Sequence, residues 1–296
     1  MSAGQIHIDG IACWTAAWPD WATAAKALRG EPMPVDDTPA ATRKRPAAAM
    51  LAPNERRRAP DSVLLALEVA QAAVAAAGLG DDPPASVFTS THGDLAIVDA
   101  LCSTLAADPL LLSPTRFHHS VHNAASGYWA IASGCQKGSS ALAQQHVGFA
   151  AGLFEAATLC LADEVPVLLV ALDTAASGRL AQVHVDRGLL AFALVLSPRR
   201  TPRSTVAMRL APGPVGLAPD LRSAAARALA GHAMADALPL AEALATLTSA
   251  DRDPSDLALD LPLDAQPGGT GLALQLERLD TDTAVPAQDN ARGAEA

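Results

Sequence analysis

The sequence predicts an α/β fold in which helices pack against a layered, largely parallel sheet. Two continuous apolar runs of strand length, VPVLLVALD at 165–173 and LLAFALVLSP at 189–198, are typical of parallel strands buried on both faces. Helical and strand-like stretches alternate before them. Of the 296 residues 50% are hydrophobic but only 3% are aromatic, so Ala, Leu and Val must form the core.

Each element follows from a local pattern. The opening IHIDGIACW alternates like a strand, and 62–80 is a helix with Asp61 as its cap and glycines at its end. Then come a strand and polar loop (85–95), a helix before Pro109 (97–108), a loop (112–127), a helix or turn (127–134), a strand or helix entry (139–145) and a helix (148–163).

The pattern weakens after Pro198. Residues 199–220 are rich in Pro and Arg, 223–247 predict one or two helices, and 256–279 predict two strands around a Pro-Gly-Gly turn. We therefore expect a first domain at 1–198, a diverged C-terminal remnant at 199–280, and a disordered tail at 281–296.

Charge and composition exclude several classes of function. A net charge of -10 disfavours nucleic acid as a partner. No apolar run reaches the roughly 18 residues of a membrane span, and no secretory signal is visible, so we expect a soluble cytoplasmic protein. We expect no cofactor or metal, because no dinucleotide or phosphate loop is present and the four cysteines are scattered: Cys13, Cys102, Cys135 and Cys160.

Two basic clusters stand out in this acidic chain, 43–45 and the run Arg56, Arg57 and Arg58. They are typical of a solvated loop, and the alternative is a docking patch for an acidic partner.

The richest polar segment is the loop that carries His118, His119, His122 and Asn123. These side chains suit hydrogen bonds to the backbone at an interface, and their spacing fits a metal site poorly. Two further pairs are candidate chemistry: Cys135 with His122 as nucleophile and base, and His92 with Asp94 as acid and base. For His92 and Asp94 the alternative is a turn with a satisfied imidazole.

Several stretches together resemble a known family: FTSTHGDL, SPTRFHHSVHNAASGYWAI, FAAGLFEA, VLLVALD and the Arg56–Arg58 run. Over about residues 5–198 the chain resembles the N-terminal half of a β-ketoacyl synthase of the thiolase fold. It is most similar to β-ketoacyl synthase-like proteins that resemble the chain-length-factor subunits of aryl polyene and xanthomonadin-type pathways. The resemblance implies a thiolase-like layered fold with a truncated, diverged C-terminal part.

The resemblance also implies where the catalytic residues belong. Condensation uses a thiolate at a helix N-terminus and two imidazoles. The family's Cys falls at Val147 or Phe149, depending on the register, and neither is a nucleophile. Gln144 lies three residues early, so its match to the Gln of classical chain-length factors is a coincidence. Beyond residue 146 only His184 and His232 remain, and neither has the family's His-Gly-Thr context.

We therefore expect a non-catalytic subunit that forms a heterodimer with a full-length β-ketoacyl synthase and meets an acyl carrier protein through that complex. Its interface would bury about 2,000 Å² or more. Candidates for the tunnel wall or interface, each with core packing or a structural role as the alternative, are Phe117, His118, His119, His122, Asn123, Tyr128, Trp129, Phe149 and Phe154. The rival hypotheses are an autonomous thiolase-fold enzyme that acts on acyl thioesters and a homodimeric scaffold.

Overall fold

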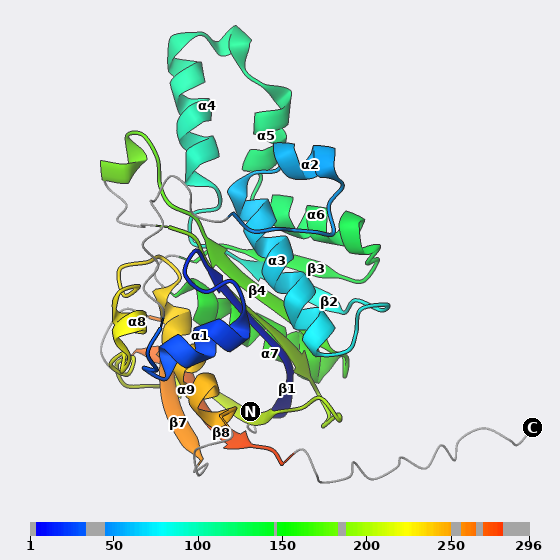
Figure 1. Ribbon diagram of the computed structural model, residues 1–296, viewed down its shortest axis with the longest axis vertical. Helices are drawn as coiled ribbons and strands as arrows, with labels where there is room; N and C mark the ends of the chain where they lie inside the picture. Colours follow the sequence, from blue (N-terminus) through cyan, green and yellow to red (C-terminus); the bar gives the residue numbers. More distant parts are fainter. Residues whose placement is uncertain are drawn as a thin grey trace, which may run out of the picture.

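A computed structural model describes residues 4–33, 45–144, 147–182, 188–249, 256–264 and 269–280. Within them one eight-stranded sheet has the order β3-β2-β4-β5-β1-β6-β8-β7 (Figure 1). The strands are β1 (Gly4–Thr15), β2 (Ala85–Thr89), β3 (Ser139–Leu142), β4 (Val167–Asp173), β5 (Leu190–Ser197), β6 (Val206–Pro214), β7 (Leu257–Pro262) and β8 (Thr270–Arg278). Mixed α/β architecture is thus confirmed.

Helices cover both faces of this sheet. The α-helices are α1 (Trp21–Leu28), α2 (Pro53–Arg58), α3 (Asp61–Ala76), α4 (Leu95–Ala107), α5 (Pro114–Ser120), α6 (Ala124–Ser133), α7 (Gly148–Ala162), α8 (Ala224–Arg227) and α9 (Leu238–Leu247). Short 3-10 turns are η2 (Pro109–Leu111), η3 (Leu180–Gln182) and η4 (Ala235–Ala237). Among the described residues, no helix is long and apolar enough to span a bilayer.

Strand β4 shows why its sequence is apolar without a break. Val167, Leu169 and Ala171 pack into the core that contains α7, α1 and α9. Leu168, Val170 and Leu172 point into the second core, which α3 and Trp129 of α6 complete. Successive side chains of a strand face opposite sides, so a strand between two helical layers is apolar at every position.

Strand direction differs from the prediction. β4 is parallel to β2, which is also parallel to β3. β5 is buried throughout, as expected, but runs antiparallel to β4 and β1. An apolar run reports burial on both faces and carries no information about strand direction.

Two further local predictions were wrong, and one strand was not predicted. The predicted loop at 112–127 contains α5, which begins at Pro114 after the Ser113 cap. Asp61 is the first residue of α3 and does not cap it; its carboxylate accepts hydrogen bonds from Arg45 instead. The Pro- and Arg-rich stretch holds β6, whose pairing with β1 and β8 carries the C-terminal strands into the same sheet.

Some predictions lie outside the described residues. They are the basic residues Arg43 and Lys44, His184, the 265–268 part of the turn between β7 and β8, and the proposed tail at 281–296.

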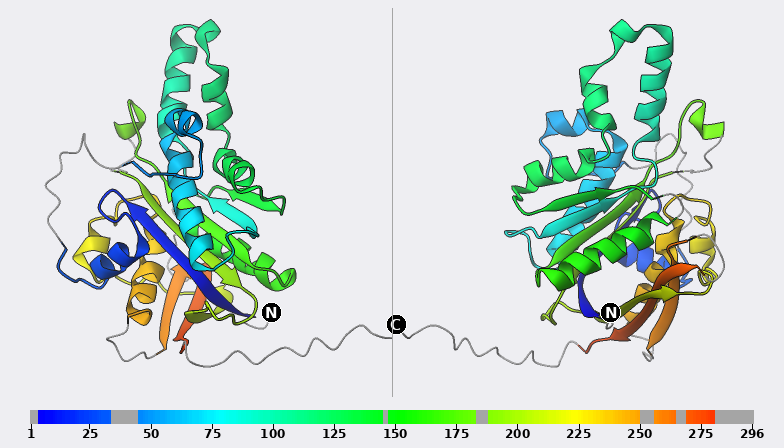
Figure 2. Two further views of the ribbon diagram at one scale, coloured as in Figure 1. Left: turned by 45° about the vertical axis from the view of Figure 1, so that its right-hand side comes forward. Right: turned by 180° about the vertical axis from the view of Figure 1, so that it is seen from behind.

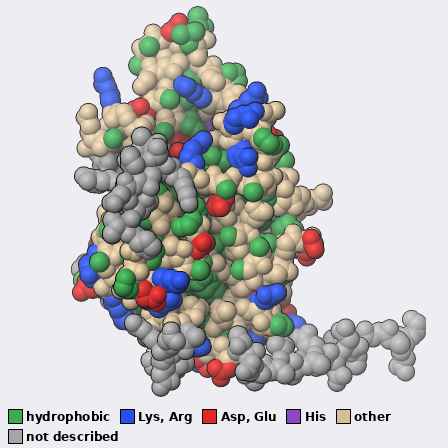
Figure 3. Space-filling model, viewed as in Figure 1, with side chains coloured by type: hydrophobic (Ala, Val, Ile, Leu, Met, Phe, Trp, Pro, Cys, Tyr) green, Lys and Arg blue, Asp and Glu red, His purple; other side chains and the backbone are tan. Residues whose placement is uncertain are grey.

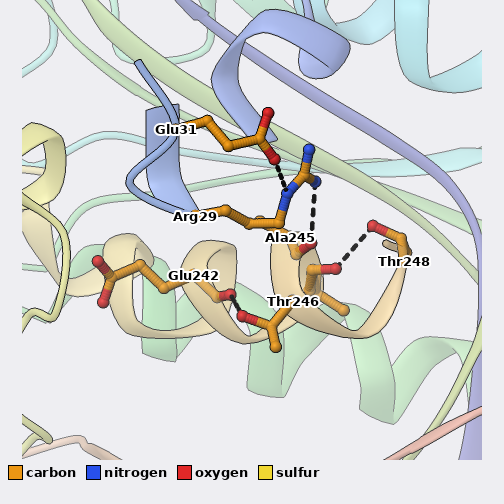
Figure 4. A network of polar contacts seen from close by, with 7 residues as sticks. Arg29, Glu31, Glu242, Ala245, Thr246 and Thr248 are labelled. Carbon is orange, nitrogen blue, oxygen red and sulfur yellow. Dashed lines mark hydrogen bonds and ion pairs between the residues drawn. The ribbon is translucent and has the colours of Figure 1, made fainter. Parts of the chain in front are cut away.

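The C-terminal helices are joined to the N-terminal part by α1. Arg29, at the end of α1, donates to the carbonyl of Ala245 in α9 over 3.2 Å and pairs with Glu31 over 2.6 Å (Figure 4). Beside this contact, the hydroxyls of Thr246 and Thr248 donate hydrogen bonds to backbone carbonyls of α9, at the C-terminal end of the helix.

The helical hairpin of α4, η2 and α5, which we call the arm, projects beyond the sheet (Figures 1 and 2). Leu95 is the only buried residue in α4, and His119 the only one in α5. The arm therefore contributes few residues to the core of the chain.

Candidate functional site at the amino end of α7

The carboxyl ends of β2 and β4 meet the amino end of α7 in a buried polar cluster. Asp173, the last residue of β4, accepts from Ser90 Oγ over 2.8 Å and from the backbone N–H of Thr91 over 2.8 Å. Thr89 Oγ1 donates to the carbonyl of Gly148 over 2.9 Å and holds the first turn of α7. Burial raises the pKa of Asp173 despite these hydrogen bonds, because the charged form is poorly solvated.

Helix α7 begins without a cap of its own. Its N-cap residue is Val147, which has no side-chain acceptor. Asp236 of η4 takes that role across the fold: its Oδ2 accepts from the N–H of Phe149 over 2.9 Å and from that of Ala150 over 3.1 Å. Burial raises the pKa of Asp236 to about 7.

The segment that leads into η4 is fixed against the same cluster. His232 is buried, its Nδ1 accepts from the N–H of Met234 over 3.2 Å, and its Nε2 lies 3.4 Å from the carbonyl of Gly188. This arrangement fits a neutral imidazole with its proton on Nε2. Thr91 Oγ1 donates to the carbonyl of Ala233 over 3.4 Å. The segment thus lies directly over the end of α7.

The side chains at the amino end of α7 include no nucleophile. Val147 and Phe149 are both buried, and Phe149 packs on Phe192 with ring centroids 5.7 Å apart. Cys160 lies near the opposite end of α7, and burial raises its pKa to about 12, as it does for Cys13. A thiol with such a pKa is almost entirely protonated at neutral pH and is a poor nucleophile.

The residues of the polar segment lie on α5 and in the turn that leads into α6. His119 Nε2 is 3.0 Å from the hydroxyl of Tyr128, and burial lowers the pKa of His119. His122 bonds through Nε2 to the carbonyl of Leu142 at the end of β3. Asn123 begins α6 without a side-chain cap, and His118 is exposed on α5. These contacts tie the segment to its surroundings through hydrogen bonds.

The aromatic candidates fall into two groups. Trp129 and Phe149 are buried in the chain's own core, and Phe154 is partly buried against it. Phe117 is 58% exposed on the arm, and Tyr128 is half-buried on α6. Phe117 is therefore the exposed aromatic candidate, while Tyr128 and Phe154 are both half-buried and packed against the chain's own core.

In the two other candidate pairs, Asp94 and Cys135 each have contacts of their own. Asp94 caps α4 by accepting from the N–H of Ile97 over 3.0 Å, and the N–H of His92 donates to Asp173. Cys135 Sγ lies 3.5 Å from the carbonyls of Pro83 and Pro84, away from the carbonyl that His122 contacts. Within the described ranges, no three metal-binding side chains come together.

A surface groove of about 500 Å³ lies between α2 and the α5–α6 corner. Apolar residues including Met50, Val121 and Ile131 line it, together with His118 and Tyr128. Arg56, Arg57 and Arg58 form the last turn of α2 beside this groove. Basic side chains gather over α2 in Figure 3.

Comparison with known proteins agrees with this fold. The family model described as beta-ketoacyl synthase, N-terminal domain, matches residues 18–253. The chain belongs to this family, which confirms the resemblance seen in its sequence. None of the curated proteins matches the chain.

Solved structures share the fold over nearly the whole chain. The ketosynthase ApeO in complex with its chain length factor ApeC from Xenorhabdus doucetiae matches with 20% identity and a TM-score of 0.62, over 93% of this chain and 99% of that one. The ishigamide ketosynthase/chain length factor matches with 14% identity and a TM-score of 0.69, over 94% and 100%. At these identities the likeness establishes the thiolase-like fold alone.

Asp173, Asp236 and the buried position of His232 were not found from the sequence. Asp236 lies in the apolar stretch AMADALPL (233–240). A single acidic residue in such a stretch resembles a solvent-facing residue of a helix. The sequence points to Asp236 only indirectly. The N-cap residue of α7, Val147, has no side-chain acceptor, so the first N–H groups of the helix need an acceptor from elsewhere.

Proposed function

We propose that this chain is a non-catalytic ketosynthase-like subunit, a chain-length factor, which pairs with an active β-ketoacyl synthase and shapes its acyl tunnel. One observation carries the proposal. At the amino end of α7, where the family places its nucleophile, the side chains are Val147 and Phe149, and Asp236 occupies the backbone N–H groups that would face a substrate.

The arm supports pairing with a second chain. Its helix α4 has the mostly apolar sequence LAIVDALCSTLAA, yet Leu95 is its only buried residue. A helix that is apolar on most sides is normally covered by protein. Large exposed apolar side chains on the arm and on α6 are Leu105 (51%), Leu110 (93%), Leu111 (73%), Phe117 (58%) and Ile131 (84%).

Strand β3 offers a second feature of the same kind. It is an edge strand of the sheet and pairs only with β2 in the described chain. The backbone N–H and C=O groups along its other edge are therefore available to another strand. A surface that combines this edge with the arm fits the large, apolar interface of an obligate pair. The ketosynthase and chain-length-factor complexes of similar fold favour a full-length synthase as the partner.

Carrier-protein docking and pathway belong to the same proposal. Arg57 and Arg58 are exposed on α2 and would steer an acidic acyl carrier protein toward the complex. The complex would act in the cytoplasm. Its product would be a polyene or polyketide chain of the aryl polyene or xanthomonadin type, in line with the sequence resemblance.

The tunnel function is tested by changing Phe117, the exposed aromatic residue of the arm. In the purified complex we expect Phe117→Ala to give longer products and Phe117→Trp shorter ones, because the side chain acts by steric exclusion. The rate of the first condensation should stay unchanged. Leu217→Ala, an exposed apolar residue after β6, is the control. Product lengths that are the same in all variants would contradict the tunnel function.

A further inference from the structure

The first turn of α7 contains two backbone N–H groups for which the N-cap residue, Val147, makes no side-chain hydrogen bond. They belong to Phe149 and Ala150, the second and third residues of the helix. These are the groups that an N-cap side chain normally satisfies, and they point where a helix attracts an electron-rich oxygen. The cap residue Val147 offers none.

We infer that Asp236 is a built-in occupant of this position and closes the amino end of α7 to the carbonyl oxygen of an acyl group. One oxygen of its carboxylate, Oδ2, accepts from both N–H groups, at 2.9 and 3.1 Å. Both donors of an oxyanion-type site are thereby used within the chain. This inference rests on the same contact as the proposed function, but its test concerns the chain by itself and does not depend on pairing with a synthase.

The surrounding residues leave little room for an external group. A Cβ added at Gly148, the first residue of α7, would lie 3.4 Å from both Met234 Cε and Thr91 Oγ1. Met234 is fully buried, and the hydrogen bonds of His232 and Thr91 hold its segment in place. Asp236 is therefore part of a packed insert over the end of the helix.

The second carboxylate oxygen gives independent support. Oδ1 is buried and finds no hydrogen-bond partner within the described part of the chain. The hydrogen bonds that hold this carboxyl in the site are those of Oδ2 to the first turn of α7. The charged group that faces it is Asp173, while His232 is engaged with backbone groups.

Replacement of Asp236 by Ala empties the position while the Cβ remains, and formate matches the missing carboxylate. At pH 7 we expect the melting temperature of Asp236→Ala in the full chain to fall by about 5 °C. Added sodium formate should restore part of this loss, and sodium chloride at the same ionic strength should not. Amide hydrogen exchange at Phe149 and Ala150 should accelerate in the variant and slow again with formate.

Two further variants complete the test. Asp236→Asn keeps an oxygen for both N–H groups, so it should retain the slow exchange at Phe149 and Ala150 even if Asp236→Ala fails to fold. Asp20, which caps α1 through Thr23 at an exposed site, is the matched control: Asp20→Ala should show no rescue by formate. Equal effects of formate and chloride on Asp236→Ala, or fast exchange in Asp236→Asn, would overturn the inference.

Discussion

At the residue scale, Asp236 couples the stability of the chain to pH. Burial raises its pKa in the folded state to about 7, whereas an unfolded Asp titrates near 3.9. The folded state therefore favours the protonated form. The resulting stabilisation is fully present below about pH 4 and is lost as the pH rises through 7. Asp173, whose pKa burial also raises, acts in the same direction.

Asp236→Asn should remove this contribution, because an amide keeps the acceptor oxygen and does not titrate. We expect the free energy of unfolding of the variant, relative to wild type, to rise by about 3 kcal/mol between pH 5 and pH 8, because only the two pH units from 5 to the folded pKa contribute. Urea unfolding at both pH values measures the difference. A constant difference across this range would show that Asp236 does not titrate there.

Gly152 of α7 is a second residue on which the packing of this helix depends. A Cβ at this position would lie 2.7 Å from Thr89 Cγ2 and 3.1 Å from Leu169 Cδ1, so α7 must approach the sheet without a side chain here. We expect Gly152→Ala to destabilise the chain by about 1–3 kcal/mol. Gly127→Ala in α6, where nothing lies within 4 Å, should be neutral or stabilising in the same unfolding assay.

At the element scale, Asp9 of β1 holds the connection between β5 and β6. Its buried carboxylate accepts from the hydroxyls of Ser197 over 2.6 Å, Thr201 over 2.9 Å and Ser204 over 2.6 Å. Asp9→Ala leaves three hydroxyls, those of Ser197 and Ser204 buried, without this acceptor and should cost about 3 kcal/mol of unfolding free energy. Ser204→Ala removes one donor and should cost about 1 kcal/mol. Equal losses would refute the role of Asp9 as the shared acceptor.

Substitutions on the surface of the arm should weaken binding to the synthase and leave the stability of the chain unchanged. Leu110→Ser with Leu111→Ser changes two exposed side chains, so the melting temperature should stay the same while affinity for the synthase falls at least about tenfold. Affinity is measured by calorimetry or by surface-immobilised synthase. Leu217→Ser, 68% exposed outside the arm, should change neither quantity. Unchanged affinity of the double variant would remove the arm from the interface.

For the whole molecule, the apolar runs and the alternation of elements were sufficient to predict the α/β fold, and the helices at 61–76, 95–107 and 148–162 lie where the pattern put them. Strand direction could not be predicted in the same way. β4 and β5 have equivalent apolar sequences, yet β4 has one parallel neighbour and β5 has none. β6 was missed because Pro212 and Pro214 resemble loop residues, although they lie within its pairing with β8.

The candidate site was predicted only in part, for a physical reason. The missing thiol could be recognised by position along the chain, since local sequence determines what begins α7. The contact of Asp236 with Phe149 depends on how two distant segments fold together, which periodicity does not report. The residues at 117–129 were recognised as polar and aromatic, but their division between core and surface followed from the packing of α5 and α6.

Co-expression with a full-length β-ketoacyl synthase, followed by size-exclusion chromatography and intact mass, tests the central claim most directly. We expect the two chains to co-elute at equal stoichiometry. We expect this chain to aggregate when it is expressed alone, because the arm and the β3 edge are then uncovered. A chain that is well behaved by itself and elutes apart from the synthase would contradict the proposal that it is a synthase subunit.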